Sequence, residues 1–383
     1  MIFLKFYKRN KSLNSFIIGF ISLMLLIFNL RCTDVKPIEE INFDTLRISV
    51  NEQYLSEYNS IGILNREESN VLVGYNYTKH SLDYFDLSSK GVIKSVLLDS
   101  YGPNKIEPLG KIATNGSLIA SINPVSGVLI LDYSCKLVEN LSLNFFENEF
   151  LKLNINKSLY PIGISFGNYD DYFFNENMLL FPLYSDIKKT ELNYENPLNY
   201  ALYNLVNKNL KILNLDYPEY FRNDFYGDLD QSYALLKGDS IIYCFANSAN
   251  IYVHDLKSNN KSTIVVNSIL GKEQSGISLF DYNDSHKRLD YFLNSSRYHS
   301  LKYDSTNNLF FRVFRDKPEK NRSLSAQNYL LVLDEKLKLI KEVKLNFGPM
   351  PDIVVVDNKL MYQYQQNESA LCFLFIELMN LKK

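Results

Sequence analysis

The densest mixture of cationic, phenolic and imidazole side chains in this sequence lies between residues 297 and 315. Five residues make up this set: Arg297, Tyr298, His299, Arg312 and Arg315. A guanidinium group can bind a carboxylate through two parallel hydrogen bonds or stack on an aromatic ring. The set is therefore a candidate binding site for a small anionic or sugar ligand. The alternative is structural, with Arg297 and Arg312 bonding strand ends or pairing with Asp304.

A second chemical pattern occupies residues 163–167, GISFG, which match the glycine–x–serine–x–glycine turn of a hydrolase nucleophile. That turn requires a strand before the serine and a helix after it. The following residues, NYDDY, are a poor helix start, and no α/β unit surrounds them. We therefore interpret the motif as a glycine-rich turn and predict no catalytic residue.

The histidines give no metal-binding pattern, because none of the four is spaced as a ligand pair. His80 and His254 are expected to be structural or solvated. Asp281, Asn283 and Asp284 resemble the start of a calcium loop, but the glycine and the distal glutamate of that loop are missing. We interpret these three residues as a solvated turn, and we expect no metal and no cofactor.

The elements that would position such groups are short strands. Residues 71–98 contain three runs in which apolar and polar side chains alternate, the mark of half-buried strands. Asp86 ends the second run, where its carboxylate can accept backbone N–H bonds inside the following turn. The pattern recurs along the chain, with a turn-forming or acidic marker in each copy: Asp86, Asp132, Asn204, Asp255, Asp334 and Glu377.

The markers lie 43 to 79 residues apart, and the longest gaps hold insertions at residues 145–177 and 269–297. Repeats of about 40–50 residues with several strands each are typical of propeller blades. We therefore predict an all-β fold, a six-bladed β-propeller, with seven blades as the alternative if an insertion hides a copy. The last copy lacks an outer strand, and residues 45–50 are predicted to supply it by pairing with residues 370–377.

The N-terminus carries a targeting pattern. Basic residues precede an apolar run at residues 16–30, and Cys32 follows, which is typical of a lipoprotein signal. We expect residues 1–31 to be a signal peptide, residues 32–44 a tether lipidated at Cys32, and residues 45–383 the propeller domain. An uncleaved anchor and a secreted form are the alternatives. The remaining cysteines, Cys135, Cys244 and Cys372, are expected to be buried without a disulfide framework.

A family resemblance rests on this start, on the blade units, and on RYHSLKYD at residues 297–304 leading into LFFR at residues 309–312. The chain is similar to the uncharacterised six-bladed β-propeller lipoproteins of Bacteroidetes-type bacteria. The resemblance covers nearly all of the chain after Cys32, and it implies a surface or periplasmic lipoprotein with no established activity. Arg31 departs from the small residues that usually precede the lipidated cysteine.

The expected function is a binding or scaffold module of the cell envelope, on the periplasmic face or the cell surface of the outer membrane. Its partner would be a ligand or an envelope protein, and we expect a monomer held to the membrane through Cys32. The sequence contains no basic stripe, so we expect no nucleic-acid partner. The alternative is an envelope hydrolase or lyase acting on glycans or peptides, which would need clustered Asp, Glu or His on the channel face.

Overall fold

The computed structural model describes residues 38–40, 43–66, 69–102, 105–123, 127–152, 159–161, 173–185, 194, 197–271, 275–318, 326–345, 353–364 and 369–381. The chain divides into two compact units, Met1–Ile38 and Glu39–Lys383, and all described strands and helices belong to the second. Cys32, the expected signal peptide and the GISFG motif lie outside the described residues.

The described chain forms six sheets, which are the six blades of the predicted propeller. In blades 1 and 2 the strands are arranged in chain order. Blade 1 consists of β3 (Ile61–Asn65), β4 (Asn70–Asn76), β5 (Ser81–Asp86) and β6 (Gly91–Leu97). Blade 2 consists of β7 (Ile112–Thr114), β8 (Ile119–Asn123), β9 (Gly127–Leu131) and β10 (Leu137–Leu141). Blade 3 contains β11 (Leu159–Pro161), β12 (Phe173–Asn175), β13 (Met178–Ser185), β14 (Leu198–Asn204) and β15 (Asn209–Leu215), and β11 and β12 both pair with β13.

The second half of the chain repeats this arrangement. Blade 4 consists of β16 (Ser232–Lys237), β17 (Ser240–Phe245), β18 (Ile251–Asp255) and β19 (Lys261–Ile264). Blade 5 consists of β20 (Arg297–Asp304), β21 (Leu309–Arg315), β22 (Asn328–Leu333) and β23 (Leu339–Leu345), with β1 (Glu39–Glu40) added parallel to β23. Blade 6 consists of β24 (Ile353–Val356), β25 (Lys359–Gln363), β26 (Ala370–Glu377) and β2 (Asp44–Ser49).

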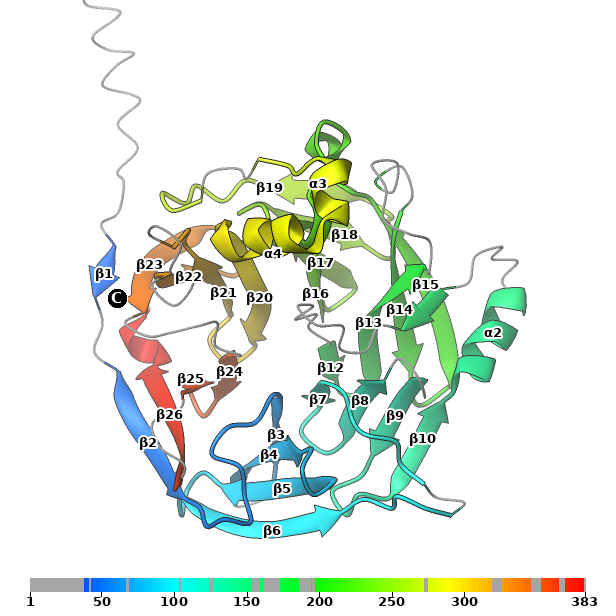
Figure 1. Cartoon of the computed structure of the whole chain (residues 1–383), viewed down its shortest axis with the longest axis vertical. Coiled ribbons are helices and arrows are strands. Elements are labelled where there is room, and N and C mark those ends of the chain that lie inside the picture. The colour runs from blue at the N-terminus through cyan, green and yellow to red at the C-terminus, as the bar shows by residue number, and fades with distance from the viewer. Residues whose placement is uncertain are drawn as a thin grey trace, which may run out of the picture. The chain divides into compact units, whose positions relative to one another are not determined.

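One inner strand of each blade lies at the axis of the ring. The six inner strands are β3, β7, β12, β16, β20 and β24, and each contacts the inner strand of the next blade around the circle. Figure 1 looks down this ring, with the sheets of Glu39–Lys383 arranged around its centre. The prediction of six blades is therefore confirmed.

The predicted marker residues form the turns expected of them. Asp86 Oδ1 accepts hydrogen bonds from the backbone N–H groups of Ser88 and Ser89, at 2.8 and 3.3 Å. The same bonds recur at the next four markers: Asp132, Asn204, Asp255 and Asp334. Each of these five markers stands where the third strand of its blade turns into the fourth. Glu377 differs, because β26 ends there and the fourth strand of its blade comes from the N-terminus.

Ring closure follows the prediction. β2 pairs antiparallel with β26, in a register that sets Asp44 opposite Phe375 and Ser49 opposite Ala370. Leu46 and Ile48 on β2 are buried against blade 6 and blade 1. β1 precedes this closing strand, so two residues of the expected tether also pair with a blade.

The long insertions contain helices that the sequence interpretation did not anticipate. α2 (Leu143–Lys152) follows blade 2, and α3 (Leu279–Asn283) and α4 (Ser285–Asn294) connect blades 4 and 5. The solvated turn predicted at Asp281, Asn283 and Asp284 is wrong. Asp281 and Asn283 belong to α3, and the Asp284 carboxylate caps α4 by accepting from the backbone N–H groups of His286 and Lys287.

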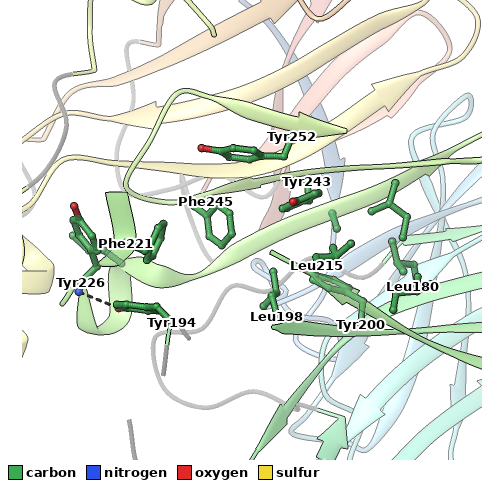
Figure 2. Packing of buried hydrophobic residues seen from close by; sticks show 14 of the residues in the cluster. Leu180, Tyr194, Leu198, Tyr200, Leu215, Phe221, Tyr226, Tyr243, Phe245 and Tyr252 are labelled. Carbon is green, nitrogen blue, oxygen red and sulfur yellow. Dashed lines mark hydrogen bonds between the residues drawn. The ribbon is translucent and has the colours of Figure 1, made fainter. Parts of the chain in front are cut away.

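Blades are held together by apolar side chains that fill the space between neighbouring sheets. Figure 2 shows the cluster between blades 3 and 4, where Tyr200 of β14 and Phe245 of β17 pack among other aromatic rings. The Tyr226 backbone N–H donates to the Tyr194 hydroxyl at 3.0 Å, which gives the buried phenol a polar partner. The three predicted core cysteines are buried, as expected, and each is present as a thiol.

Candidate functional site

The five residues predicted as a ligand site come together on the first two strands of blade 5, but none is exposed. Their exposed fractions are Arg297 2%, Tyr298 2%, His299 6%, Arg312 0% and Arg315 3%. These side chains therefore lie inside the protein and are not presented at its surface. Hydrogen bonds to backbone carbonyl groups explain how three arginine side chains can be buried here.

Arg312 is bonded to backbone carbonyls of the neighbouring blade. Its guanidinium donates to the Phe245, Ser248 and Ala249 oxygens at 2.8, 2.9 and 3.0 Å. The Tyr298 ring lies against the same group, with its centroid 4.5 Å from Arg312 Cζ. Arg312 thus fastens β21 of blade 5 to the turn that joins β17 and β18 in blade 4.

Arg297 and Arg315 hold the end of helix α4. Arg297 Nη1 donates to the Phe292 oxygen, and Arg315 Nη1 donates to the Leu293 oxygen at 3.1 Å. The last carbonyls of a helix lack partners within the helix and carry its negative dipole end. The two guanidinium groups satisfy these carbonyls and fix the insertion onto blade 5. The structural alternative is correct in kind, although Asp304 accepts its bonds from Thr306 and Asn307 rather than from an arginine.

His299 is a neutral member of this cluster. Arg297 Nε–H donates to His299 Nε2 at 3.2 Å, so that nitrogen carries no proton. Burial above all, and then the positive charge of Arg297, hold the pKa of His299 well below its ordinary value. Ligand binding by the five residues stays a prediction, and the contacts that the structure describes are with the protein itself.

The other predicted histidines are structural. His80 lies in the turn between β4 and β5, with Nδ1 2.8 Å from the Tyr75 hydroxyl and Nε2 2.8 Å from the Ile106 oxygen. His254 Nε2 lies 2.7 Å from Asn259 Oδ1. Both rings therefore brace turns, as expected from the sequence.

A buried carboxylate in blade 1 also has a structural explanation. Asp83 is fully buried, and its oxygens accept hydrogen bonds from four neutral groups: the hydroxyls of Tyr58, Ser81 and Ser95 and the amide of Asn76. These donors replace the water that a buried anion would otherwise lack. The sequence contains no signal for this network, because Tyr58 is far from Asp83 along the chain.

A cavity with a volume of about 570 Å³ lies on the axis of the ring. All six inner strands line it: β3, β7, β12, β16, β20 and β24. Its described lining carries three cations, Lys111, Lys237 and Lys302, and no Asp, Glu or His. Sequence reasoning missed these lysines, because β12 lies inside an insertion and the inner strands could not be aligned with one another.

Blades 1 and 2 approach each other closely at one side of this cavity. The Ile63 backbone N–H donates to Thr114 Oγ1 at 3.1 Å, and the Asn65 N–H donates to the Gly116 oxygen at 2.7 Å. A Cβ atom on Gly62 would lie 2.4 Å from the Thr114 methyl group. The missing side chain of Gly62 therefore lets the two inner strands meet.

Comparison with known proteins places the fold in a family. A family described as Domain of unknown function (DUF4221) matches residues 37–344. The chain belongs to this family. A solved structure of a DUF4221 member from Bacteroides vulgatus aligns with a TM-score of 0.67 and 16% identity, over 88% of this chain and 98% of that one. The expected relationship to propeller proteins of Bacteroidetes-type bacteria is confirmed.

A second solved structure, a putative exported protein from Bacteroides fragilis, aligns with a TM-score of 0.48 and 12% identity, over 89% of this chain and 97% of that one. No curated protein sequence matches the chain. At these identities the structural likeness bears on the fold alone, so the function must be argued from the site.

Two further properties concern only the part of the chain that the structure describes. There, no helix combines the length and the apolar character needed to cross a bilayer. In the same residues, no three side chains of the His, Cys, Asp or Glu type are grouped so that they could hold a metal ion.

Proposed function

We propose that this chain is a non-catalytic ligand-binding module of the cell envelope, with its ligand site in the axial cavity. One observation carries the proposal: all six blades contribute their inner strand to a single cavity of about 570 Å³. Small-molecule sites in proteins commonly have volumes of roughly 300–1,000 Å³ and mostly apolar walls with a few polar groups. Such a cavity suits a small molecule better than a protein segment.

The composition of the walls favours binding over hydrolysis. A glycan or peptide hydrolase needs a positioned acid or base, usually Asp, Glu or His. Among the described residues that line the cavity, none is of these types. Isoleucine, valine and leucine residues of β3, β16 and β24 line the cavity together with asparagine, threonine and lysine residues.

The envelope location is part of the proposal, and its support comes from the first residues of the chain. A basic start, an apolar run at residues 16–30 and Cys32 directly after it are the pattern of a lipid-anchored, exported protein. A lipidated Cys32 would hold the propeller at a membrane as a monomer, since the ring is closed within one chain.

The cavity can be tested by filling it. Val355 on β24 lines the cavity and is half-buried, so Val355→Trp should occupy part of the volume. Val206 is 73% exposed in the turn between β14 and β15, and Val206→Trp is the matched control. Thermal shift would be measured with a panel of sugars, sugar phosphates, amino acids and dicarboxylates.

We expect at least one class to raise the melting temperature of the native chain and of V206W, and to have no effect on V355W. The proposal fails if no class stabilises the native chain, or if V355W responds as the native chain does. The chain contains no native tryptophan, so the emission of the new indole at position 355 gives a second readout of cavity occupancy.

A further inference from the structure

We infer that the axial cavity binds a small organic oxyanion, a molecule that carries carboxylate or phosphate groups. This inference rests on the proposed function and adds the chemical class of the ligand. It begins from the charge of the cavity. Lys111, Lys237 and Lys302 come from blades 2, 4 and 5, and the described lining holds no acidic residue. The chain as a whole has a formal net charge of −2, so this excess of cations does not reflect the average composition.

Among the three lysines, Lys237 has the best-defined surroundings. Its Nζ atom lies 4.7 Å from the centroid of the Tyr303 ring and 5.0 Å from that of Phe310. Aromatic faces attract a cation but do not neutralise it. No described carboxylate forms an ion pair with Lys237, so none of the described side chains neutralises its charge.

The positive potential extends across the axis. Lys111 precedes β7 in blade 2, yet its charge acts on His299 in blade 5. The pKa of His299 is held low by burial first, then by Arg297, Arg315, Arg312 and finally Lys111. Cations from two blades therefore act on the same imidazole.

The mixed lining of the cavity suits a small anion with an organic framework. Ile61, Ile63, Leu236 and Val354 line the cavity beside polar residues such as Thr114, so the walls offer hydrocarbon contacts and hydrogen-bond partners as well as cations. A concave site lined by one sign of charge raises the local concentration of oppositely charged ligands. A neutral sugar can only accept hydrogen bonds from a lysine side chain, whereas a carboxylate or a phosphate also gains the attraction between opposite charges.

The test uses succinate, glucose 6-phosphate and glucose as probes, with affinity measured by calorimetry at low ionic strength on the full folded chain. The key variants are Lys237→Gln, Lys302→Gln and the charge-preserving Lys237→Arg. Lys211 is exposed on β15, away from the axis, and Lys211→Gln is the matched control. Because Lys237 and Lys302 lie on different strands, one variant remains informative if the other fails to fold.

We expect succinate or glucose 6-phosphate to bind the native chain and K211Q equally. K237Q and K302Q should each bind at least tenfold more weakly, K237R should retain most of the affinity, and glucose should not bind. Binding of succinate would identify a carboxylate as the recognised group, and binding of glucose 6-phosphate would identify a phosphate. If glucose binds in a manner sensitive to V355W and neither anion does, the charge inference is overturned and the proposed function stands. The inference is also overturned if none of the probes binds, or if K237Q and K302Q bind the anions as tightly as the native chain does. In either case the V355W experiment decides the proposed function separately.

Discussion

Replacing Arg312 with methionine should destabilise the protein without altering its surface, because this side chain is fully buried. The change removes three hydrogen bonds to backbone carbonyls of blade 4. The Phe245 oxygen keeps a weaker bond from the Ser248 N–H at 3.3 Å, so the oxygens of Ser248 and Ala249 lose the most. A buried polar group left without a partner costs about 1–3 kcal/mol, and two such groups predict a loss of about 2–6 kcal/mol.

The expected loss can be converted into a melting temperature. An unfolding entropy near 2.1 cal/mol/K per residue gives roughly 0.7 kcal/mol/K for a unit of this size, so the midpoint should fall by about 3–9 °C. Urea unfolding followed by circular dichroism gives the free energy directly. Arg47 is exposed on β2, and R47M is the matched control, expected to stay within about 0.5 kcal/mol of the native chain.

The reasoning would be refuted by an R312M protein as stable as R47M. That result would mean that the turn between β17 and β18 finds other donors or opens to water at little cost. A loss above about 6 kcal/mol would instead indicate that the whole contact between blades 4 and 5 depends on this guanidinium.

Four further changes test other features. A chain that begins at Asn51 lacks β2 and should melt well below one that begins at Phe43, which lacks only β1; equal melting would show that β2 is not needed for closure. Cys32→Ala should abolish incorporation of labelled fatty acid, and unchanged labelling would contradict lipidation at this residue. His299 in the unfolded chain gains a proton near its ordinary pKa of about 6.5, whereas burial and Arg297 keep the folded imidazole neutral. Stability should therefore fall as the pH drops below about 6.5, and His299→Gln should flatten that dependence in urea titrations from neutral to mildly acidic pH. Changing both Arg297 and His299 to Ala should lower the melting temperature, because the side chains are buried and Arg297 bonds the end of α4. An unchanged melting temperature would contradict this capping role.

The repeating strands were predictable because the sequence of each blade contains the signals for its own strands and turns. Alternating side chains and a turn aspartate such as Asp132 act within a few residues, so they can be recognised without knowing what packs against them. Closure was predictable for a related reason, since a final copy without a fourth strand leaves an edge that another segment must cover.

The role of the arginine cluster was harder to foresee because it depends on partners distant in the chain. Charge normally indicates exposure, and only the turn at Ser248 and the end of α4 show that Arg312 and Arg315 have carbonyls to bond. The axial lysines were missed for another reason. β12 is three residues long and lies inside an insertion, so no pattern in the sequence identifies the strands that face the axis.

The pairing of β2 with β26 also determines when the protein can be finished. During synthesis, β2 leaves the ribosome roughly 330 residues before β26, a delay on the order of 15–70 s at about 5–20 residues per second. Blades 1 to 5 can form in that interval from strands near in sequence, but the apolar side chains of Leu46 and Ile48 must wait for their partner strand. A chain that stops before Ala370 therefore keeps an open ring and an uncovered apolar strand, the features by which proteases and chaperones distinguish an incomplete product from a finished one.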